Sequence, residues 1–308
     1  MDASLAAVVL VTGLLFGSFL NVCIHRLPRG LSVVRPRSAC PYCSAFIPWY
    51  DNVPVVSWLW LRGRCRQCKR AISPRYIAVE ILTALLFLAC YAAFGQSWSM
   101  VKFCVFSFLL LGLIFTDAEH KLLPDGMTLP GLGLGLLFSL LVPVEDLAAK
   151  LLASRIELPV ASEMGWRVLS LADSLLGAAV GASFIYGAGA LYRRARGVEG
   201  MGFGDVKLMA MVGAFLGTKL TVFTVFAASL LGSLFGIGTV LLVWLKRTRR
   251  HMVRRHQPGQ AARKRAWKSA KIVYRHYEMP FGVFLGSMAI LAAFLGNRVL
   301  GWYWGFYR

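Results

Sequence analysis

Residues 5–24 read LAAVVLVTGLLFGSFLNVCI, a run of twenty residues without a single charged side chain. A helix of about 20 apolar residues spans the hydrocarbon core of a bilayer. This stretch therefore predicts a transmembrane helix near the start of the chain. Met1 and Asp2 carry no basic charge, and the apolar run is long enough to span, so we do not expect a cleaved signal peptide.

The rest of the composition is also typical of a membrane protein. Hydrophobic residues make up 57% of the 308 residues and charged residues only 16%, whereas a soluble domain carries about 25% charged residues. Further apolar runs fall at about 76–94, 101–116, 126–144, 171–192, 220–245 and 280–300, with a shorter one at 205–217. The sequence predicts an all-α polytopic membrane protein with about eight transmembrane helices.

The distribution of basic residues predicts how the chain is oriented in the membrane. The net charge is +20, and 27 of the 34 Lys and Arg residues fall in 25–75, 193–207, 246–278 and at Lys121. Eight spans with both termini outside place all of these on one face, which the positive-inside rule assigns to the cytoplasm. We interpret the basic tract 246–271 as a cytoplasmic loop lying against anionic lipid headgroups, not as a nucleic-acid-binding arm. No nucleic-acid partner is expected.

These patterns divide the chain into three parts. The first is a transmembrane helix in residues 1–24, and the second is a cytoplasmic loop domain in 25–75. The third is a multi-helix membrane core in 76–308, which includes the basic cytoplasmic loop 246–278. The stretch 145–170 is expected to form an external loop or a short amphipathic insertion.

Four of the seven cysteines form two C-x-x-C pairs in the loop 25–75. CPYC holds Cys40 and Cys43, and CRQC holds Cys65 and Cys68. Four thiolates spaced in this way are typical of a closed tetrahedral zinc site with a structural role. Disulfides are the alternative, which a reducing cytoplasm disfavours. The remaining three cysteines lie in apolar segments and are interpreted as small core residues, namely Cys23, Cys90 and Cys104.

Two acids stand at the ends of predicted spans. Asp117 lies in FTDAEHKLLPD at 115–125, and Asp205 lies in GMGFGDVKLMAMVGAFLG at 200–217. Ionisable residues at such positions are costly and mark functional sites. Two facing carboxylates share a proton, so that the ionised one can activate a water while the protonated one polarises a carbonyl. Gly202 and Gly204, which lack Cβ atoms, allow a substrate backbone to approach Asp205.

A purely structural interpretation of these acids stays open from the residues alone. Asp117 and Asp205 are then helix-terminal acids, with Asp205 capping the span that follows it. Asp125 follows a proline and precedes an apolar run, so it is interpreted as an N-cap. Glu119 is two residues from Asp117 and is expected to point away from it. Lys207 either neutralises a neighbouring carboxylate or binds lipid headgroups.

The motifs together resemble a known family. GSFLNVCIHRLPRG at 17–30, the two C-x-x-C pairs and RGRCRQCKRAISPRYIAVEILTA at 62–84 resemble the N-terminal half of the prepilin peptidases, also called type IV leader peptidases. FTDAEHKLLPD, GMGFGDVKLMAMVGAFLG and MPFGVFLG at 279–286 resemble the later motifs of the same family, in the same order. The resemblance covers about residues 13–295.

This resemblance implies a membrane aspartyl protease of the bacterial inner membrane, with Asp117 and Asp205 as its catalytic pair near the cytoplasmic face. The implied substrates are type IV prepilins or type II secretion pseudopilins, which carry a short basic leader. Many members also methylate the new N-terminus with S-adenosylmethionine, and the loop 25–75 is a plausible contributor to that activity. The chain departs from the family pattern at Glu119, where Asp is common, and in the long stretch 145–170.

Three other functions remain as alternatives. The first is a related intramembrane aspartyl protease with other substrates. The second is an ion-conducting transporter that uses the membrane acids as a cation path. The third is a zinc-knuckle membrane scaffold without catalytic activity. The paired cysteines and the order of the motifs disfavour the first alternative. Proton flux that survives loss of peptidase activity would support the second, and processing that survives mutation of the aspartates would support the third.

Overall fold

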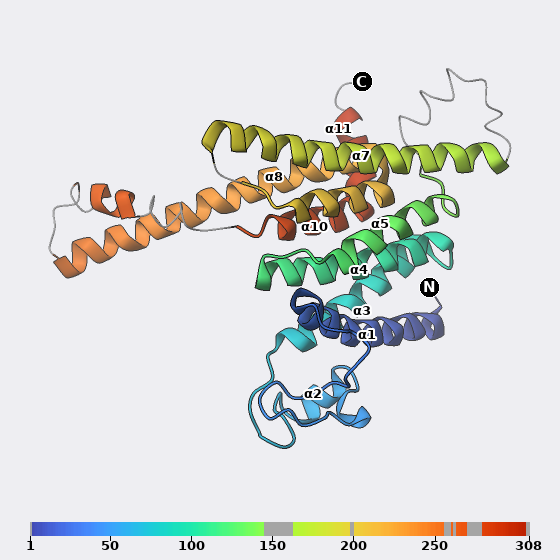
Figure 1. Cartoon of the computed structure of the whole chain (residues 1–308), viewed down its shortest axis with the longest axis horizontal. Coiled ribbons are helices and arrows are strands. Elements are labelled where there is room, and N and C mark those ends of the chain that lie inside the picture. The colour runs from blue at the N-terminus through green and yellow to red at the C-terminus, as the bar shows by residue number, and fades with distance from the viewer. Residues whose placement is uncertain are drawn as a thin grey trace.

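A computed structural model of the chain describes residues 2–144, 163–197, 200–255, 260, 263–269 and 279–305. These residues are mostly helical, and apart from two isolated bridges they contain no β-structure. The long helices lie side by side in one bundle, with the segment between α1 and α3 protruding at one edge (Figure 1). The predicted all-α fold is confirmed.

Seven long helices and a set of short ones make up the described chain. The long helices are α1 (Ala3–Arg26), α3 (Arg75–Phe94), α4 (Trp98–His120), α5 (Asp125–Ser139), α7 (Glu163–Arg196), α8 (Phe203–Arg255) and α10 (Phe281–Leu291). The last of these continues through a π-helical turn, Ala292–Gly296, into α11 (Asn297–Gly305). The segment between α1 and α3, called here the cysteine loop (residues 27–74), holds η1 (Leu27–Arg29), η2 (Trp49–Asp51) and α2 (Val56–Trp60).

Helix α8 consists of two arms that fold back on each other. A Cβ atom built on Gly181 of α7 would lie 2.5 Å from the Met209 carbonyl oxygen and 2.9 Å from Cγ2 of Thr221. In a straight helix those two α8 residues would be about 18 Å apart along the axis. The chain therefore reverses between them, at Gly217, whose φ of 75° and ψ of 179° are non-helical. The arms correspond to the predicted spans 205–217 and 220–245.

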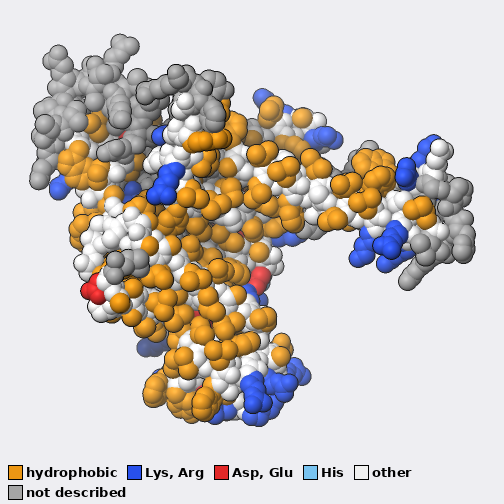
Figure 2. Space-filling model, turned by 180° about the vertical axis from the view of Figure 1, so that it is seen from behind, with side chains coloured by type: hydrophobic (Ala, Val, Ile, Leu, Met, Phe, Trp, Pro, Cys, Tyr) orange, Lys and Arg blue, Asp and Glu red, His pale blue; other side chains and the backbone are white. Residues whose placement is uncertain are grey.

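The described helices account for a multi-pass membrane protein. Six of them are long and apolar enough to cross a bilayer, with α8 counted once. Helix α5, with 15 residues, and the second arm of α8 lie where two further spans were predicted, so the count of about eight spans is approximate. Hydrophobic side chains cover the body of the bundle, and Lys and Arg gather on the cysteine loop and at the protruding end of α8 (Figure 2).

Two stretches singled out in the sequence lie partly outside the described residues. Helix α8 continues to Arg255, so the first residues of the basic stretch 246–278 are helical. Most of the rest of that stretch is outside the described residues. Of the predicted external insertion 145–170, residues 145–162 are also outside them, and 163–170 belong to the start of α7.

Glycine pairs bring α7 and α8 into backbone contact. A Cβ atom on Gly177 would lie 2.5 Å from the Gly213 carbonyl oxygen and 2.8 Å from the carbonyl carbon of Gly217. Gly177 and Gly181 are four residues apart on α7, as are Gly213 and Gly217 on α8. Small residues with this spacing are the usual means by which membrane helices approach closely, since hydrophobicity does not drive helices together in lipid.

Glycines also bring α1 and α3 into backbone contact. A Cβ atom on Gly13 would lie 2.6 Å from Cα of Ala84, and one on Gly17 would lie 2.7 Å from Cα of Glu80. The two helices therefore touch through their backbones along one face. Because the cysteine loop connects the end of α1 to the start of α3, this contact fixes both ends of the loop.

The glycine contact between α7 and α8 makes a testable prediction. Gly177→Ala should lower the free energy of unfolding by about 1–3 kcal/mol, because the new methyl group overlaps the α8 backbone. Gly187→Ala on the same helix is the matched control, since a Cβ atom there would meet nothing within 4 Å. Thermal unfolding of both variants in the same detergent measures the difference. Equal melting temperatures would show that α7 and α8 do not pack as described.

Candidate active site

Asp117 lies in the last turn of α4 and is 6% exposed. Its Oδ2 accepts a hydrogen bond from the backbone N–H of Val283, at 3.0 Å, in the first turn of α10. A Cβ atom on Gly282 would lie only 2.9 Å from that same oxygen. Glycine is therefore the residue that lets α10 reach the carboxylate. The exposed N–H groups at a helix N-terminus favour a negative charge, so α10 is well placed to stabilise Asp117.

Asp205 lies in the first turn of α8 and is 9% exposed. Its backbone N–H donates to the Gly202 carbonyl at 3.1 Å, which closes the turn that begins the helix. Gly204, the residue before Asp205, and Gly282, beside the Asp117 carboxylate, both lie against Leu123, so the two acids stand in one region. The structure thus brings the two acids together from helices that are 88 residues apart in the chain.

Leu123 marks the point where the three segments meet. A Cβ atom built on Gly204, next to Asp205, would lie 3.4 Å from Cδ1 of Leu123. A Cβ atom built on Gly282, next to the Asp117 carboxylate, would lie 3.2 Å from the same Cδ1. The segment after α4, the start of α8 and the start of α10 therefore converge on one small region. That Asp117 and Asp205 face one another at matching depth in the membrane stays a prediction.

Asp125 does not have the N-cap role expected for it. Pro124 is the N-cap of α5 and Asp125 is its first helical residue. The Asp125 carboxylate pairs with Nζ of Lys207, at 2.7 and 2.8 Å. Its side chain is more than half exposed, and the N-cap Pro124 makes no side-chain cap hydrogen bond. Of the two interpretations of Lys207, the pairing with a carboxylate is the one observed.

Glu119 points to the other side of α4, as its spacing from Asp117 predicted. It forms an ion pair with Arg75, the first residue of α3. His120 Nε2 lies 3.9 Å from the same carboxylate. Glu119 therefore contacts the start of α3 and not the pair of aspartates.

The four loop cysteines form one cluster. Their sulfur atoms all lie within 4.8 Å of one another, with Cys40 Sγ 3.8 Å from Cys68 Sγ and Cys43 Sγ 4.0 Å from Cys65 Sγ. A disulfide requires about 2.05 Å, so none of the four is oxidised here. The spacing suits four ligands around a single metal ion.

Both C-x-x-C pairs have the same backbone shape. In the first, the Ser44 N–H donates to the Cys40 carbonyl, and in the second the Lys69 N–H donates to the Cys65 carbonyl. Ser44 and Lys69 have φ angles of 56° and 58°, which turn the chain back after each pair. Backbone N–H groups of Cys68 and Gln67 donate to the Cys65 sulfur and lower the pKa of its thiol to about 7. The thiolate is the form that binds metals.

Comparisons with known proteins identify the family of the chain. Residues 11–94 match the bacterial peptidase A24 N-terminal domain, and residues 104–237 match the type IV leader peptidase family. A protein of Aeromonas hydrophila named prepilin leader peptidase/N-methyltransferase is 32% identical, over 96% of this chain and 93% of its own length. The chain belongs to the type IV leader peptidase family.

Two further relatives carry the same name. A protein of Myxococcus xanthus (strain DK1622) is 39% identical over 75% of this chain and 62% of its own length. One of Pseudomonas aeruginosa is 36% identical over 74% of this chain and 78% of its own length. No solved structure matches the chain. The resemblance noted in the sequence to the type IV leader peptidases is confirmed.

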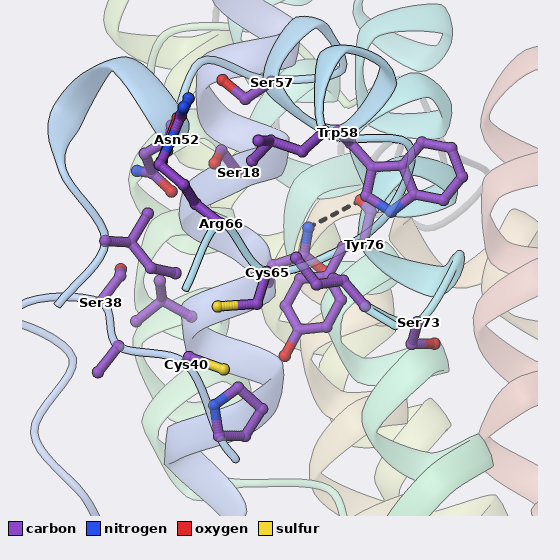
Figure 3. A pocket seen from close by; sticks show the side chains of 18 of the residues that line it. Ser18, Ser38, Cys40, Asn52, Ser57, Trp58, Cys65, Arg66, Ser73 and Tyr76 are labelled. Atoms are coloured by element: carbon purple, nitrogen blue, oxygen red, sulfur yellow. Dashed lines mark hydrogen bonds and ion pairs between the residues drawn. The ribbon is translucent and has the colours of Figure 1, made fainter. Parts of the chain in front are cut away.

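The structure also contains a cavity of about 580 Å³ under the cysteine loop. The cavity is lined by residues of α1, the cysteine loop and α3, and Figure 3 shows Ser18, Trp58 and Tyr76 around it. Glu119 lines it too, whereas neither Asp117 nor Asp205 does. Sequence reasoning did not find this cavity or the contact of α10 with Asp117, because both join segments far apart in the chain.

The cysteine cluster predicts the metal content of the purified chain. We expect about one tightly bound metal ion per chain, lost on Cys65→Ser because three thiolates no longer complete a tetrahedral set. Cys23→Ala, which changes a cysteine of α1 outside the cluster, should retain the metal. Elemental analysis after dialysis measures both variants. Full metal occupancy in Cys65→Ser would contradict the assignment.

Proposed function

We propose that this chain is an aspartyl endopeptidase that removes the basic leader from type IV prepilins or type II secretion pseudopilins. We propose further that it methylates the new N-terminus. The observation that carries the peptidase proposal is that the end of α4, with Asp117, and the starts of α8, with Asp205, and of α10 converge on one small region. The names of the relatives, all prepilin leader peptidase/N-methyltransferase, support both activities.

The two carboxylates have different roles in hydrolysis. Like charges at short range cannot both ionise easily, so one proton is shared between them. The ionised carboxylate takes a proton from water as that water attacks the scissile carbonyl. The protonated one donates a hydrogen bond to the carbonyl oxygen, where negative charge develops. When the tetrahedral intermediate collapses, the carbon–nitrogen bond breaks and the leaving nitrogen receives the proton taken from water. No covalent intermediate with the enzyme is required.

The contact with α10 gives Asp117 a distinct environment. Its Oδ2 is held by the Val283 N–H, while Asp205 stands at the beginning of α8 beside two glycines. A hydrogen bond from a backbone N–H favours the ionised form of a carboxylate. The same bond fixes the Asp117 carboxylate against the first turn of α10.

The substrate fits the position of this site at the ends of the helices. A prepilin carries a basic leader, then a glycine, then an apolar helix. We propose that the apolar helix packs among the membrane spans and holds the junction at headgroup depth. A glycine before the scissile bond has no side chain to exclude from a tight site.

The location follows from the charge pattern. Asp117 lies at the end of α4, which meets the start of α3, just after the cysteine loop, through the Glu119–Arg75 ion pair. Figure 1 shows the start of α8 and its basic protruding end toward this same side of the bundle. The positive-inside rule places such a face in the cytoplasm. We therefore propose a multi-pass protein of the bacterial inner membrane, with its active site near the cytoplasmic face and its basic segments against membrane lipids.

We propose zinc as the metal of the cysteine cluster. Cys40, Cys43, Cys65 and Cys68 supply four sulfur ligands, which suits a tetrahedral zinc ion, and a set of four protein ligands leaves no open position for catalysis. Such a metal folds a segment that is too small to bury a core of its own. The role of zinc is therefore structural.

The methyl donor proposed for the second activity is S-adenosylmethionine, which supplies a methyl group attached to a positively charged sulfur. The acceptor is the amino group that cleavage exposes. This activity requires a second binding site, because the two aspartates serve hydrolysis. The other functions considered, a transporter or a catalytically inert scaffold, are not favoured by the family or by the names of the relatives.

Substitution of the aspartates tests the peptidase proposal. Asp117→Asn and Asp205→Asn should each lower cleavage of a type IV prepilin in membranes by at least about a hundredfold, since general acid–base catalysis contributes this much. Asp125→Asn is the matched control, because this acid lies at the same end of the bundle but pairs with Lys207. It should retain cleavage. Full activity in either of the first two variants would show that the wrong acid has been assigned.

A further inference from the structure

The cysteine loop exposes many large apolar side chains. Residues 38–61 of this loop contain a single charged residue, Asp51. Trp49 and Trp60 are 80% and 81% exposed. Surfaces in contact with water rarely gather large apolar side chains in this way unless they bind a partner or a membrane. The name apolar patch is used here for six side chains that are each more than half exposed, namely Phe46, Trp49, Tyr50, Val56, Leu59 and Trp60.

Helix α2 turns its apolar side outward. Val56, Leu59 and Trp60 are spaced three and four residues apart, so they share one face of the helix. On the other face Ser57 is buried, and a Cβ atom built on Gly63 would lie 2.7 Å from the ring of Trp58. A helix on a surface in contact with water has the reverse arrangement, with its apolar side against the core. The outer face of α2 therefore suits an apolar environment.

Hydrogen bonds hold the apolar patch in this outward position. The Ser57 hydroxyl donates to the Tyr50 carbonyl at 2.9 Å and accepts from the Val53 N–H at 3.1 Å, which joins α2 to η2. The Val55 N–H donates to the carboxylate of Glu80 on α3 at 2.7 Å, and Glu80 is only 8% exposed. The patch is therefore a fixed surface of the fold.

Charged side chains are separated from the apolar patch. Asp51 pairs with Arg66 at 2.6 Å, and its own side chain is only 7% exposed. The basic residues of the loop flank the patch in sequence, three at 29–37 and five at 62–70. On the face shown in Figure 2, hydrophobic side chains gather on one side of the cysteine loop and Lys and Arg on the other. Apolar surface bordered by Lys and Arg is typical of elements that lie in a membrane interface.

The position of α2 beside the spans places the apolar patch at the depth of the membrane boundary. Glu80, which holds Val55 at the start of α2, is about 8 Å along the axis from the start of α3. It lies inside the apolar run 76–94, and the next two residues, Ile81 and Leu82, are each 40% exposed, as expected of side chains that face lipid. The cysteine loop lies beside the C-terminal part of α1 (Figure 1). Lipid that surrounds the spans therefore reaches the outer face of α2.

We propose that the apolar patch of the cysteine loop inserts into the lipid surface of the membrane in which the helix bundle is embedded. The loop is then an interfacial element, with its apolar side about 5–10 Å into the boundary between headgroups and acyl chains. Trp and Tyr are the residues that favour this boundary, because their rings have an apolar body and a polar edge. The Lys and Arg at the rim reach the headgroups with their long side chains.

Charge favours lipid over a protein as the occupant of the apolar patch. The cysteine loop carries eight Lys and Arg, and the one acid beside the patch, Asp51, is already paired. A second copy of the chain, with its net charge of +20, meets like charge at this rim, and so does the basic leader proposed for the substrate. Anionic lipid headgroups are attracted to it.

Fluorine NMR of the full-length chain tests the proposal. The chain is labelled with 5-fluorotryptophan and placed in lipid nanodiscs without prepilin, and Trp49→Phe, Trp58→Phe and Trp60→Phe assign the three signals. One sample contains a phospholipid with a spin label near the top of its acyl chain, and another contains a water-soluble gadolinium chelate. The signals of Trp49 and Trp60 should relax at least about threefold faster with the spin-labelled lipid, because both rings lie in the interface. They should respond less to the chelate.

Trp58 is the matched control within the same helix, because it faces Gly63 and not the outside. Its signal should respond less to the spin-labelled lipid than those of Trp49 and Trp60. A stronger effect of the chelate than of the spin-labelled lipid on Trp49 and Trp60 would overturn the proposal, since the apolar patch would then face water and be open to a soluble partner.

No response of Trp49 and Trp60 to either agent would overturn the proposal as well, because protein, such as a second copy of the chain, would then cover the apolar patch. The relaxation is measured on the wild-type sequence, and the Phe variants serve only for assignment. Misfolding of a variant therefore cannot produce the expected result. The measurement does not involve cleavage, so its outcome is independent of the peptidase proposal.

Discussion

A carboxylate buried at the end of a membrane helix has to be hydrogen-bonded, because an isolated charge there is very costly. Asp117 meets this requirement with the backbone N–H of Val283, which is 166 residues further along the chain. That bond requires the first turn of α10 to lie against the end of α4, and Gly282 permits the approach. The arrangement of the site around α4, α8 and α10 depends on this one contact.

The rest of the bundle positions the second acid. Asp205 starts the short first arm of α8, and the reversal at Gly217 sends the second arm back along it. Glycine contacts with α7 hold that hairpin against the bundle. In lipid, close backbone packing of this kind replaces the hydrophobic driving force that joins helices in water. Small residues at a few positions therefore decide where the start of α8 lies.

Much of this could be predicted from the sequence, because the signals are local. The apolar runs gave the helices, including both arms of α8, and the C-x-x-C spacing predicted the cysteine cluster. The direction of Glu119 followed from its two-residue spacing from Asp117. The N-cap interpretation of Asp125 was wrong because its partner, Lys207, is 82 residues away. The α10 contact and the cavity were likewise beyond prediction, since no periodicity reports which distant segments meet.

The central claim is that Asp117 and Asp205 face each other. Cysteine cross-linking of the double variant Asp117→Cys/Asp205→Cys tests it most directly, in a chain whose three isolated cysteines are replaced by alanine, namely Cys23, Cys90 and Cys104. Mild oxidation should join the pair, because a disulfide forms only when the two Cα atoms lie within about 7 Å. Ser97→Cys with Asp205→Cys should not react, since Ser97 caps the far end of α4, about 30 Å from Asp117. Failure of the first pair to cross-link, or equal reaction of the control, would contradict the account.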